Sequence, residues 1–371
     1  MTLIARLCNF MRTESRAVVF ILGLAVTLHD HAMAGVTSDT LHTIETARVK
    51  QFTLSIYLPP CYTSLRKYSV IYFNDGQHIF GEQGLGVDLE ADVLLKQGHM
   101  EPIIVVGIHS DRQRTSFYVP YEDDGVTVDF GFYRPLADWY TSRIIRDIMP
   151  YVNRRYSTGP RTGIAGYSFG GLHATWAALN YPERFSFSGA LSPSYWVRDF
   201  EILNEGKKAR KGQVYYFDVG TGEWNYYVPM LAKTGLKILN DVFYYEAMNA
   251  RHVLADWRGL RIRNILLLFA GKTNWNRYDW TVNLEVIRSD YTGKTYLRIN
   301  PVITFSNGLT ASISYAATFA LLNPNDGVIN KDGSFRFLGN RDLKVIVTYL
   351  GESKTIDVMY DQVANYRFEH Q

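Results

Sequence analysis

The feature that most constrains this chain is residues 163–171, where glycines surround Ser168 in a G-x-S-x-G pattern. This pattern is typical of a nucleophile elbow, a sharp turn between a strand and a helix that holds the serine hydroxyl clear of the backbone. Gly166 and Gly170 flank the serine because side chains at those two places would collide in so tight a turn. The stretch therefore predicts a strand, a serine turn and a helix in succession.

The residues on either side of the motif fit that order. Residues 162–165 are typical of a short buried strand, and Leu172, Trp176 and Leu179 recur at helical spacing until Pro182. The alternative is a glycine-rich turn that merely contains a serine. The flanking pattern favours the elbow.

Strands and helices alternate along most of the chain. Apolar or period-two runs predict strands, and helical spacing predicts helices over 136–148, where Pro150 ends or kinks the helix, and over 254–270. The predicted strands are residues 52–58, 68–73, 103–108, 162–165, 185–191, 213–219 and 242–247. Such alternation predicts an α/β fold with a mostly parallel central sheet.

The pattern changes beyond Gly271, where helical periodicity gives way to short alternating runs separated by Asn-Gly and Asp-Gly turns. We therefore expect an α/β domain over 35–271 and an all-β domain, most simply a sandwich, over 272–371.

The first 34 residues differ from the rest. Three arginines precede an apolar run over 17–28, and Ala-Met-Ala follows at 32–34. This order is typical of a secretory signal peptide, here cleaved after Ala34. The run is shorter than the roughly 20 residues that span a bilayer, so we expect no permanent membrane span. Met11 is an alternative start to Met1.

Composition excludes several classes of function. The chain carries 39 Lys and Arg against 36 Asp and Glu, a net charge of +3. Without basic clustering we expect no nucleic-acid partner. Removal of the signal leaves Cys61 as the single cysteine, and the histidines show no metal-binding spacing, so neither a disulfide, a metal nor a cofactor is expected. The oligomeric state stays open.

A serine nucleophile needs a base within hydrogen-bond reach and an acid that orients the base. With this elbow the chain order is serine, acid, histidine. Of the three histidines after Ser168, His173 lies on the helix that leaves the elbow and His370 is next to last in the chain. We therefore expect His252, in a loop after a strand, to be the base.

The acid is expected at the carboxyl end of a strand between these two residues. Glu223 follows the strand over 213–219 and is our choice, with Asp218 and Glu246 as alternatives. A solvated loop carboxylate is the competing interpretation of Glu223.

Substrate would meet residues around the same turns. The oxyanion hole is expected from the backbone N–H of Phe169 and from that of Gly76 or Gln77, in the turn after the strand over 68–73. Side chains assigned to a substrate pocket are His78, Tyr195, Trp196, Arg112 and Arg114. The two arginines equally fit a solvated loop, and the two aromatic residues equally fit the core.

These motifs together resemble the putative-esterase family of α/β-hydrolases, which includes siderophore (enterochelin) esterases, S-formylglutathione hydrolase, feruloyl and xylan acyl esterases, and mycolyltransferases. The resemblance covers about residues 43–271. It implies an α/β-hydrolase fold with a triad on Ser168, Glu223 and His252, whereas the C-terminal domain resembles a bacterial immunoglobulin-like domain. The residues that carry it are Tyr57-Leu58-Pro59-Pro60, Asp75-Gly76-Gln77, Val105-Val106-Gly107-Ile108, residues 166–171, Leu191-Ser192-Pro193-Ser194, Gly220-Thr221-Gly222-Glu223, and His252 with Trp257.

The expected function is that of a secreted or periplasmic serine carboxylesterase that works through an acyl-enzyme. Its substrate would be a siderophore lactone or an acylated sugar. Two alternatives remain: a non-catalytic binding or adhesion protein on a hydrolase scaffold, and an acyltransferase.

Overall fold

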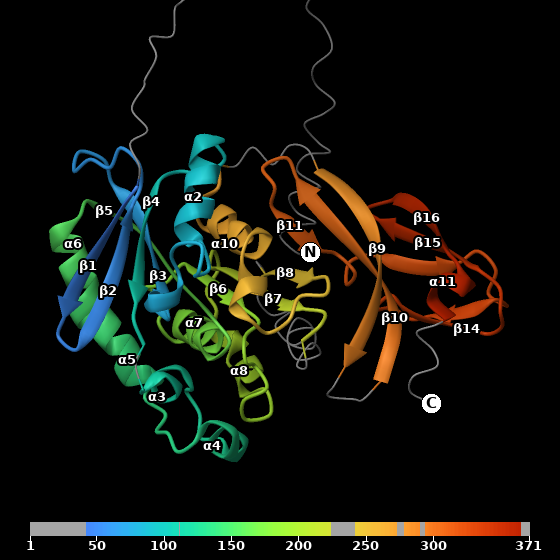
Figure 1. Cartoon of the computed structure of the whole chain (residues 1–371), viewed down its shortest axis with the longest axis horizontal. Helices are drawn as coiled ribbons and strands as arrows, with labels where there is room; N and C mark the ends of the chain where they lie inside the picture. The colour runs from blue at the N-terminus through green and yellow to red at the C-terminus, as the bar shows by residue number, and fades with distance from the viewer. Residues whose placement is uncertain (1–41, 111, 224–241, 273–277, 290–293, 365–371) are drawn as a thin grey trace, which may run out of the picture.

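The computed structural model describes residues 42–110, 112–223, 242–272, 278–289 and 294–364 (Figure 1). The predicted signal peptide and both candidate start residues lie outside the described residues, as does His370.

An eight-stranded sheet forms the larger lobe. Its order is β1-β2-β4-β3-β5-β6-β7-β8, with β1 and β2 antiparallel to their neighbours and every pairing from β4 to β8 parallel. The prediction of a mostly parallel sheet is confirmed. The strands are β1 (Thr43–Val49), β2 (Phe52–Leu58), β3 (Tyr68–Asn74), β4 (Ile103–Ile108), β5 (Thr158–Tyr167), β6 (Phe187–Leu191), β7 (Val214–Gly220) and β8 (Val242–Ala247).

Helices cover both faces of this sheet, which is why β4 is buried along its whole length. The side chains of β3 alternate between the two layers: Val70 and Tyr72 belong to one core cluster, Ile71 and Phe73 to the other. One face carries α2 (Val87–Lys96) and α10 (Leu260–Ala270). The other carries α3 (Arg114–Tyr118), α5 (Ala137–Arg143), α6 (Met149–Arg155) and α7 (Phe169–Asn180).

Two predicted helices are interrupted. Pro150 does not end its helix: α5 continues through a π-helical turn, η2 (Ile144–Ile148), into α6, and the proline has no N–H to donate to the preceding turn. The helix predicted over 254–270 divides into η5 (Leu254–Trp257) and α10 at Gly259, whose φ is +61°.

The segment around Arg112 and Arg114, for which a solvated loop was one expectation, contains α3, and α4 (Asp124–Phe130) follows it. Asp123 caps α4 by accepting the Val126 N–H at 2.9 Å. The remaining short helices are η1 (Gly76–His78), α8 (Glu201–Asn204), η3 (Gly206–Lys208) and α11 (Tyr360–Ala364).

The C-terminal lobe is built from two antiparallel sheets, consistent with the predicted all-β sandwich. One has the order β11-β10-β14-β13 with β9 paired to β10, and the other is β12-β15-β16. Its strands are β9 (Tyr278–Ser289), β10 (Lys294–Phe305), β11 (Thr310–Ser312), β12 (Thr318–Leu321), β13 (Gly327–Ile329), β14 (Ser334–Phe337), β15 (Leu343–Tyr349) and β16 (Glu352–Val358). The immunoglobulin-like identity and the boundary at residue 271 stay predictions.

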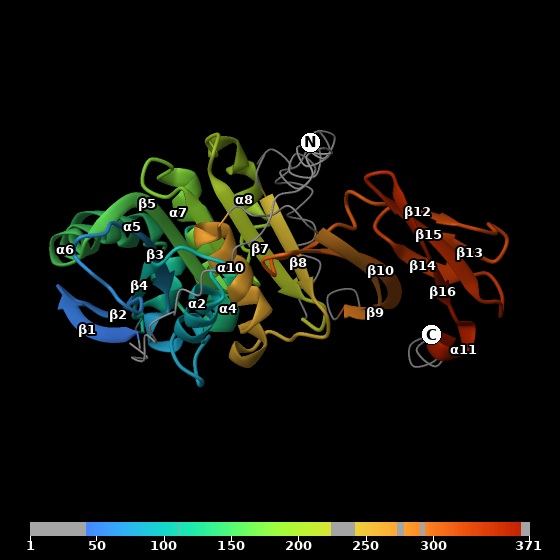
Figure 2. The ribbon, with the colours of Figure 1, turned by 90° about the horizontal axis from the view of Figure 1, so that it is seen from above.

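The β-rich lobe lies against the β8 edge of the large sheet, as both views show (Figures 1 and 2). The Glu246 N–H on β8 donates to Ser312 Oγ on β11 at 3.0 Å. Asn264 of α10 exchanges two hydrogen bonds with the backbone of Thr310, at 2.9 and 3.0 Å. The two lobes also share one apolar core, so the junction is packed and not a loose linker.

Candidate active site

Ser168 occupies the turn between β5 and α7 with φ +55° and ψ −124°, a conformation that is costly for a residue with a side chain. Two backbone hydrogen bonds hold it there: its N–H donates to Leu191 O at 2.9 Å, and Ser194 N–H donates to Ser168 O at 3.2 Å. A Cβ on Gly166 would lie 2.6 Å from the carbonyl carbon of Gly170. The predicted steric reason is therefore confirmed for Gly166, whereas a Cβ on Gly170 would meet Asn74 Cβ and Asp75 Oδ2, both at 3.2 Å.

Three side chains from distant loops meet at this turn. His252 Nε2 lies 3.1 Å from Ser168 Oγ, and His252 Nδ1 lies 2.7 Å from Glu223 Oε2. The serine follows β5, the glutamate β7 and the histidine β8, so all three lie at the carboxyl edge of the sheet. An ionised Glu223 accepts a hydrogen bond from Nδ1–H of His252, which leaves the Nε2 lone pair facing the serine hydroxyl.

Burial differs along this chain of hydrogen bonds. Ser168 and His252 are both partly exposed, the latter side chain by 23%, whereas the Glu223 side chain is fully buried. Burial alone would raise the pKa of Glu223, but the hydrogen bond to His252 and the charge of Arg261 outweigh it and lower the pKa below its usual value. The carboxylate therefore stays ionised at neutral pH.

The alternative acids are engaged elsewhere. Asp218 on β7 pairs with Arg261, whose Nε lies 2.9 Å from Asp218 Oδ2. Glu246 on β8 pairs with Arg298 of the C-terminal lobe. The structure therefore brings only Glu223, of the three carboxylates considered, to the histidine.

The turn after β3 packs against the elbow. Asn74 Nδ2 donates to Gly170 O at 2.8 Å, and a Cβ on Gly76 would lie 2.3 Å from the Gly107 carbonyl carbon, so only glycine fits there. Phe169 begins α7, and Gly76 and Gln77 begin η1. N–H groups in the first turn of a helix have no carbonyl partner within that helix.

Arg114, predicted in a loop, lies on α3 and is committed to a protein carboxylate. Its Nε and Nη2 donate to the two oxygens of buried Asp75 at 2.8 and 2.9 Å, and Ser110 Oγ donates to Asp75 Oδ1 at 2.6 Å. This pairing uses the Nε and Nη2 donors of the guanidinium, and the assignment of Arg114 to a substrate pocket stays a prediction. Arg112 is exposed, which fits a solvated loop, and His78 is exposed at the end of η1.

Tyr195 does not line a pocket. Its ring is buried in the core, and its hydroxyl lies 2.6 Å from Thr175 Oγ1 on α7. Trp196 is partly buried, and its ring centroid lies 6.0 Å from that of Phe169. Phe130 packs edge-on against Phe169 with ring centroids 4.9 Å apart. Phe130 is a neighbour of the elbow that sequence reasoning missed, because α4 carries no clear helical periodicity.

His173 is a core histidine, as its place on the elbow helix suggested. Its Nδ1 lies 3.0 Å from Asn74 Nδ2, and its Nε2 lies 2.9 Å from Thr141 Oγ1. Burial lowers the pKa of His173 to about 3, so it is neutral.

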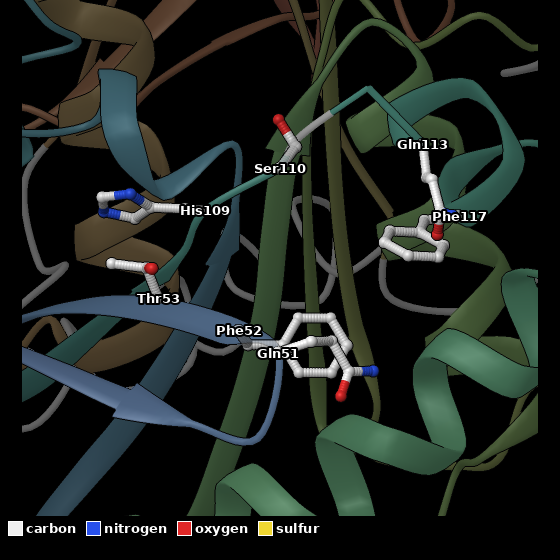
Figure 3. A pocket seen from close by; sticks show the side chains of 7 residues that line it. All are labelled: Gln51, Phe52, Thr53, His109, Ser110, Gln113 and Phe117. Atoms are coloured by element: carbon white, nitrogen blue, oxygen red, sulfur yellow. The ribbon is translucent and has the colours of Figure 1, made fainter.

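A separate cavity of about 370 Å³ opens where β2 begins and β4 ends (Figure 3). Ser110, on its wall, connects it to the turn after β3 through Gln77, whose Nε2 lies 2.8 Å away. None of the lining residues belongs to the Ser168–His252–Glu223 chain. They are Gln51, Phe52, Thr53, His109, Ser110, Gln113 and Phe117.

Within the described residues, His, Cys, Asp and Glu side chains form no group of three able to hold a metal ion. Over the same residues, every helix is too short or too polar to cross a membrane.

Glu223 contacts Ser192, Gly220 and Arg261, and Trp257 contacts Ser192. Sequence reasoning assigned no role to Ser192, Gly220, Trp257 or Arg261. Arg261 could have been noticed in the sequence, because it is a charged residue on the apolar face of α10 and would need a buried partner.

The chain is similar to several known proteins over part of its length. The curated relatives include YbbA of Bacillus subtilis, 28% identical over 154 residues (40% of this chain and 59% of YbbA). They also include the iron(III) enterobactin esterase of Escherichia coli O6:H1, 28% identical over 140 residues. That second match covers 34% of this chain and 33% of the relative, so the chain spans only part of these two proteins.

Solved structures share the fold. An IroE-like serine hydrolase from Shewanella oneidensis superposes with a TM-score of 0.53 at 17% identity, over 61% of this chain and 80% of that one. The enterobactin esterase FES from Shigella flexneri, in the presence of enterobactin, gives a TM-score of 0.51 at 20% identity, over 62% and 59%. The α/β-hydrolase fold is thereby established. Since the family described as putative esterases matches residues 47–298, more than half of the 371, this chain belongs to that family.

Proposed function

We propose that this protein is a serine carboxylesterase with Ser168 as nucleophile, His252 as general base and acid, and Glu223 as the orienting carboxylate. The observation that carries the proposal is the unbroken hydrogen-bonded chain from Ser168 Oγ through His252 to Glu223. Membership of the putative-esterase family supports it.

In the first half of the reaction, His252 Nε2 takes the proton of Ser168 Oγ as the oxygen attacks the ester carbonyl carbon. The tetrahedral intermediate collapses, the C–O bond breaks, and the imidazolium returns the proton to the leaving alcohol. In the second half, His252 deprotonates a water that attacks the acyl-enzyme, and Ser168 leaves with that proton. Glu223 stabilises the imidazolium in both halves.

The carbonyl oxygen becomes negatively charged in each half and needs donors. We assign the N–H of Phe169 and the N–H of Gly76 or Gln77 to this role, because they begin two helices at turns packed against each other. Loss of one such donor typically lowers kcat about 10²- to 10³-fold.

The substrate class we propose is a siderophore lactone, with an acylated sugar as the second candidate. The name of one relative, iron(III) enterobactin esterase, supports the first. The aromatic side chains of Phe130, Phe169 and Trp196 beside the nucleophile suit a ring-bearing acyl group. Turnover of enterobactin-type lactones, feruloylated xylan and short-chain nitrophenyl esters, compared side by side, ranks these classes.

A fluorophosphonate probe tests the mechanism. We expect stoichiometric labelling of the wild-type protein, loss of labelling in Ser168→Ala, and full labelling in the control Ser142→Ala, whose exposed hydroxyl contacts Trp139 O. Absence of labelling in folded wild-type protein would instead favour a non-catalytic scaffold. Formation of a new ester when alcohols or sugars are added would identify an acyltransferase.

Export to the periplasm or beyond is also part of the proposal, on the strength of residues 1–34. The mass of the protein recovered from the periplasm or medium should correspond to a chain that begins at Gly35. Retention in the cytoplasm at full length would contradict it.

A further inference from the structure

A buried polar cluster lies behind Glu223. We call it the acid cluster, and its members are Ser192 after β6, Asp218 on β7, Trp257 in η5 and Arg261 on α10 (Figure 1). Their exposed fractions are 0% for Ser192, 0% for Asp218, 4% for Trp257 and 2% for Arg261. Burying a polar group costs folding free energy unless the group is hydrogen-bonded. The hydrogen-bond partners therefore restrict where each polar proton of the cluster can point.

The proton of the Ser192 hydroxyl has one possible direction. Trp257 Nε1 donates to Ser192 Oγ at 2.9 Å, and Arg261 Nη2 donates to it at 2.5 Å. An indole N–H and a guanidinium N–H can only donate, so together they occupy both lone pairs of the oxygen. The remaining contact is with Glu223 Oε1, and the hydroxyl must donate its proton there.

This donation fixes the orientation of the Glu223 carboxylate. Oε1 accepts from Ser192 Oγ and from the Gly220 N–H at 2.8 Å. Oε2 is left for His252 Nδ1 at 2.7 Å. Rotation of the carboxylate would break both bonds on Oε1 in a site without solvent, so the oxygen that faces His252 is set by its neighbours.

Ser192 is itself held from behind. Its backbone has φ +41°, and its N–H donates to Asp218 Oδ1 at 3.0 Å. Asp218 also accepts from the Tyr216 hydroxyl at 2.6 Å and pairs with Arg261. The backbone and the hydroxyl of Ser192 are therefore anchored by the same ion pair.

The formal charges of the buried groups beside His252 sum to −1. Arg261 is positive, and burial, which lowers its pKa, is outweighed by Asp218, which raises it. Arg261 neutralises one of the two carboxylates, and its Nη1 lies 3.5 Å from Glu223 Oε1. Asp218, Glu223 and Arg261 together carry a net charge of −1, which an imidazolium at His252 would balance.

Trp257 connects the cluster to the imidazole as well. Its ring stands perpendicular to that of His252 with centroids 4.8 Å apart, and it stacks on Tyr167 at 4.5 Å. The group that directs the Ser192 proton thus also supports the ring that Glu223 orients.

From this geometry we infer that Ser192 is a positioning residue for the esterase reaction: its hydroxyl, aimed by Trp257 and Arg261, holds Glu223 with Oε2 toward His252. The inference rests on the proposed function and extends it to residues outside the triad.

Ser192→Ala tests it, since alanine fits the same backbone and removes only the hydroxyl. We expect kcat to fall about 10- to 100-fold, the range typical of a lost hydrogen bond to a charged group, with KM within about twofold. The acidic limb of the kcat/KM profile should move to higher pH, because a carboxylate without this donor holds the imidazolium more tightly. Ser188→Ala is the matched control: it is a fully buried serine of β6 whose hydroxyl lies 3.4 Å from Thr175 Oγ1.

Three outcomes would overturn the inference. The first is an unchanged kcat in Ser192→Ala. The second is a lower kcat in Ser192→Ala with no shift in the acidic limb of the kcat/KM profile, which would indicate a merely structural role. If Ser192→Ala does not fold, Trp257→Phe carries the test, since it removes the indole N–H and keeps a ring. An unchanged kcat and pH profile in that variant is the third.

Fluorophosphonate labelling separates this inference from the proposed function. An unlabelled wild-type protein would defeat the proposed esterase itself. A labelled wild type with an unaltered Ser192→Ala would defeat only the role of Ser192.

Discussion

Two buried arginines, Arg261 and Arg298, give an instructive comparison. Each is 2% exposed, and each is paired with a carboxylate whose side chain is fully buried, Asp218 and Glu246 respectively. Arg261 joins α10 to β7 within the α/β lobe, whereas Arg298 joins β10 of the C-terminal lobe to β8. The chemistry of the two pairs is the same.

What differs is where the hydrogen bonds lead. From Arg261 they continue through Ser192 and Glu223 to His252, which is 23% exposed. Among the residues that the structure describes, those from Arg298 lead to Ser314 Oγ and to the Asp332 carbonyl, both 2.8 Å away. A buried ion pair alone is thus weak evidence for an active site, and its connection to a partly exposed titratable group is the more informative sign.

The largest effect is expected from Arg261→Met. It leaves Asp218 buried and unpaired, which typically costs about 3–5 kcal/mol of unfolding free energy. It also removes one donor to Ser192, so kcat of the folded fraction should fall at least about tenfold. Urea unfolding and ester turnover measure the two effects. Wild-type kcat in this variant would erase the distinction between the two arginines.

Arg298→Met should cost a similar 3–5 kcal/mol or so, because Glu246 loses its partner. In contrast to Arg261→Met, kcat of the folded protein should stay within about twofold, since no hydrogen bond among the described residues joins this pair to the Ser192–Glu223–His252 chain. The same two measurements apply. A tenfold loss of kcat would show that the lobe junction reaches the active site after all.

The double variant Arg298→Met/Glu246→Leu sharpens the assignment of Arg298 to a structural role. Replacing both members of a buried pair with apolar residues of similar size is often neutral. We therefore expect at least half of the stability lost in Arg298→Met to return, by urea unfolding. A further loss of stability would mean that the pair itself, and not the unpaired charge, sets the cost.

His173 supplies the smallest effect and a contrast to both arginines, because it is buried without a charge. Burial lowers its pKa to about 3, whereas an unfolded chain titrates near 6.5. Between pH 6.5 and pH 3, His173 is protonated in the unfolded state but neutral in the folded state. The unfolding free energy therefore falls as the pH drops toward 3. The contribution lost by pH 5 is about 2 kcal/mol. His173→Gln should be less sensitive by that amount between pH 7 and 5, and an unchanged slope would refute it.

Chain order and strand ends were enough to select Ser168, His252 and Glu223. The order of the motif restricts the candidates, and the carboxyl edge of a parallel sheet gathers loops that are distant in sequence. The elbow glycines could be predicted for the same reason, since a tight turn imposes a local steric condition.

Side-chain direction could not be predicted in the same way. Tyr195 follows a strand end, yet it turns inward to Thr175 because the space beneath α7 accepts a ring. Arg114 lies in a segment without clear periodicity, and its partner Asp75 is 39 residues away. The role of Ser192 depends on Trp257 and Arg261, 65 and 69 residues further along. Such networks arise only when the fold brings their donors to one oxygen.

The shared core and the Arg298–Glu246 pair have a practical meaning for recombination between family members. A chimaera that keeps this hydrolase sheet but receives another C-terminal module would carry the Glu246 carboxylate into a foreign interface. The crossover point in such a design therefore belongs after β11, with Arg298 and the β11 contacts retained, and not at residue 271, where the sequence predicts the boundary.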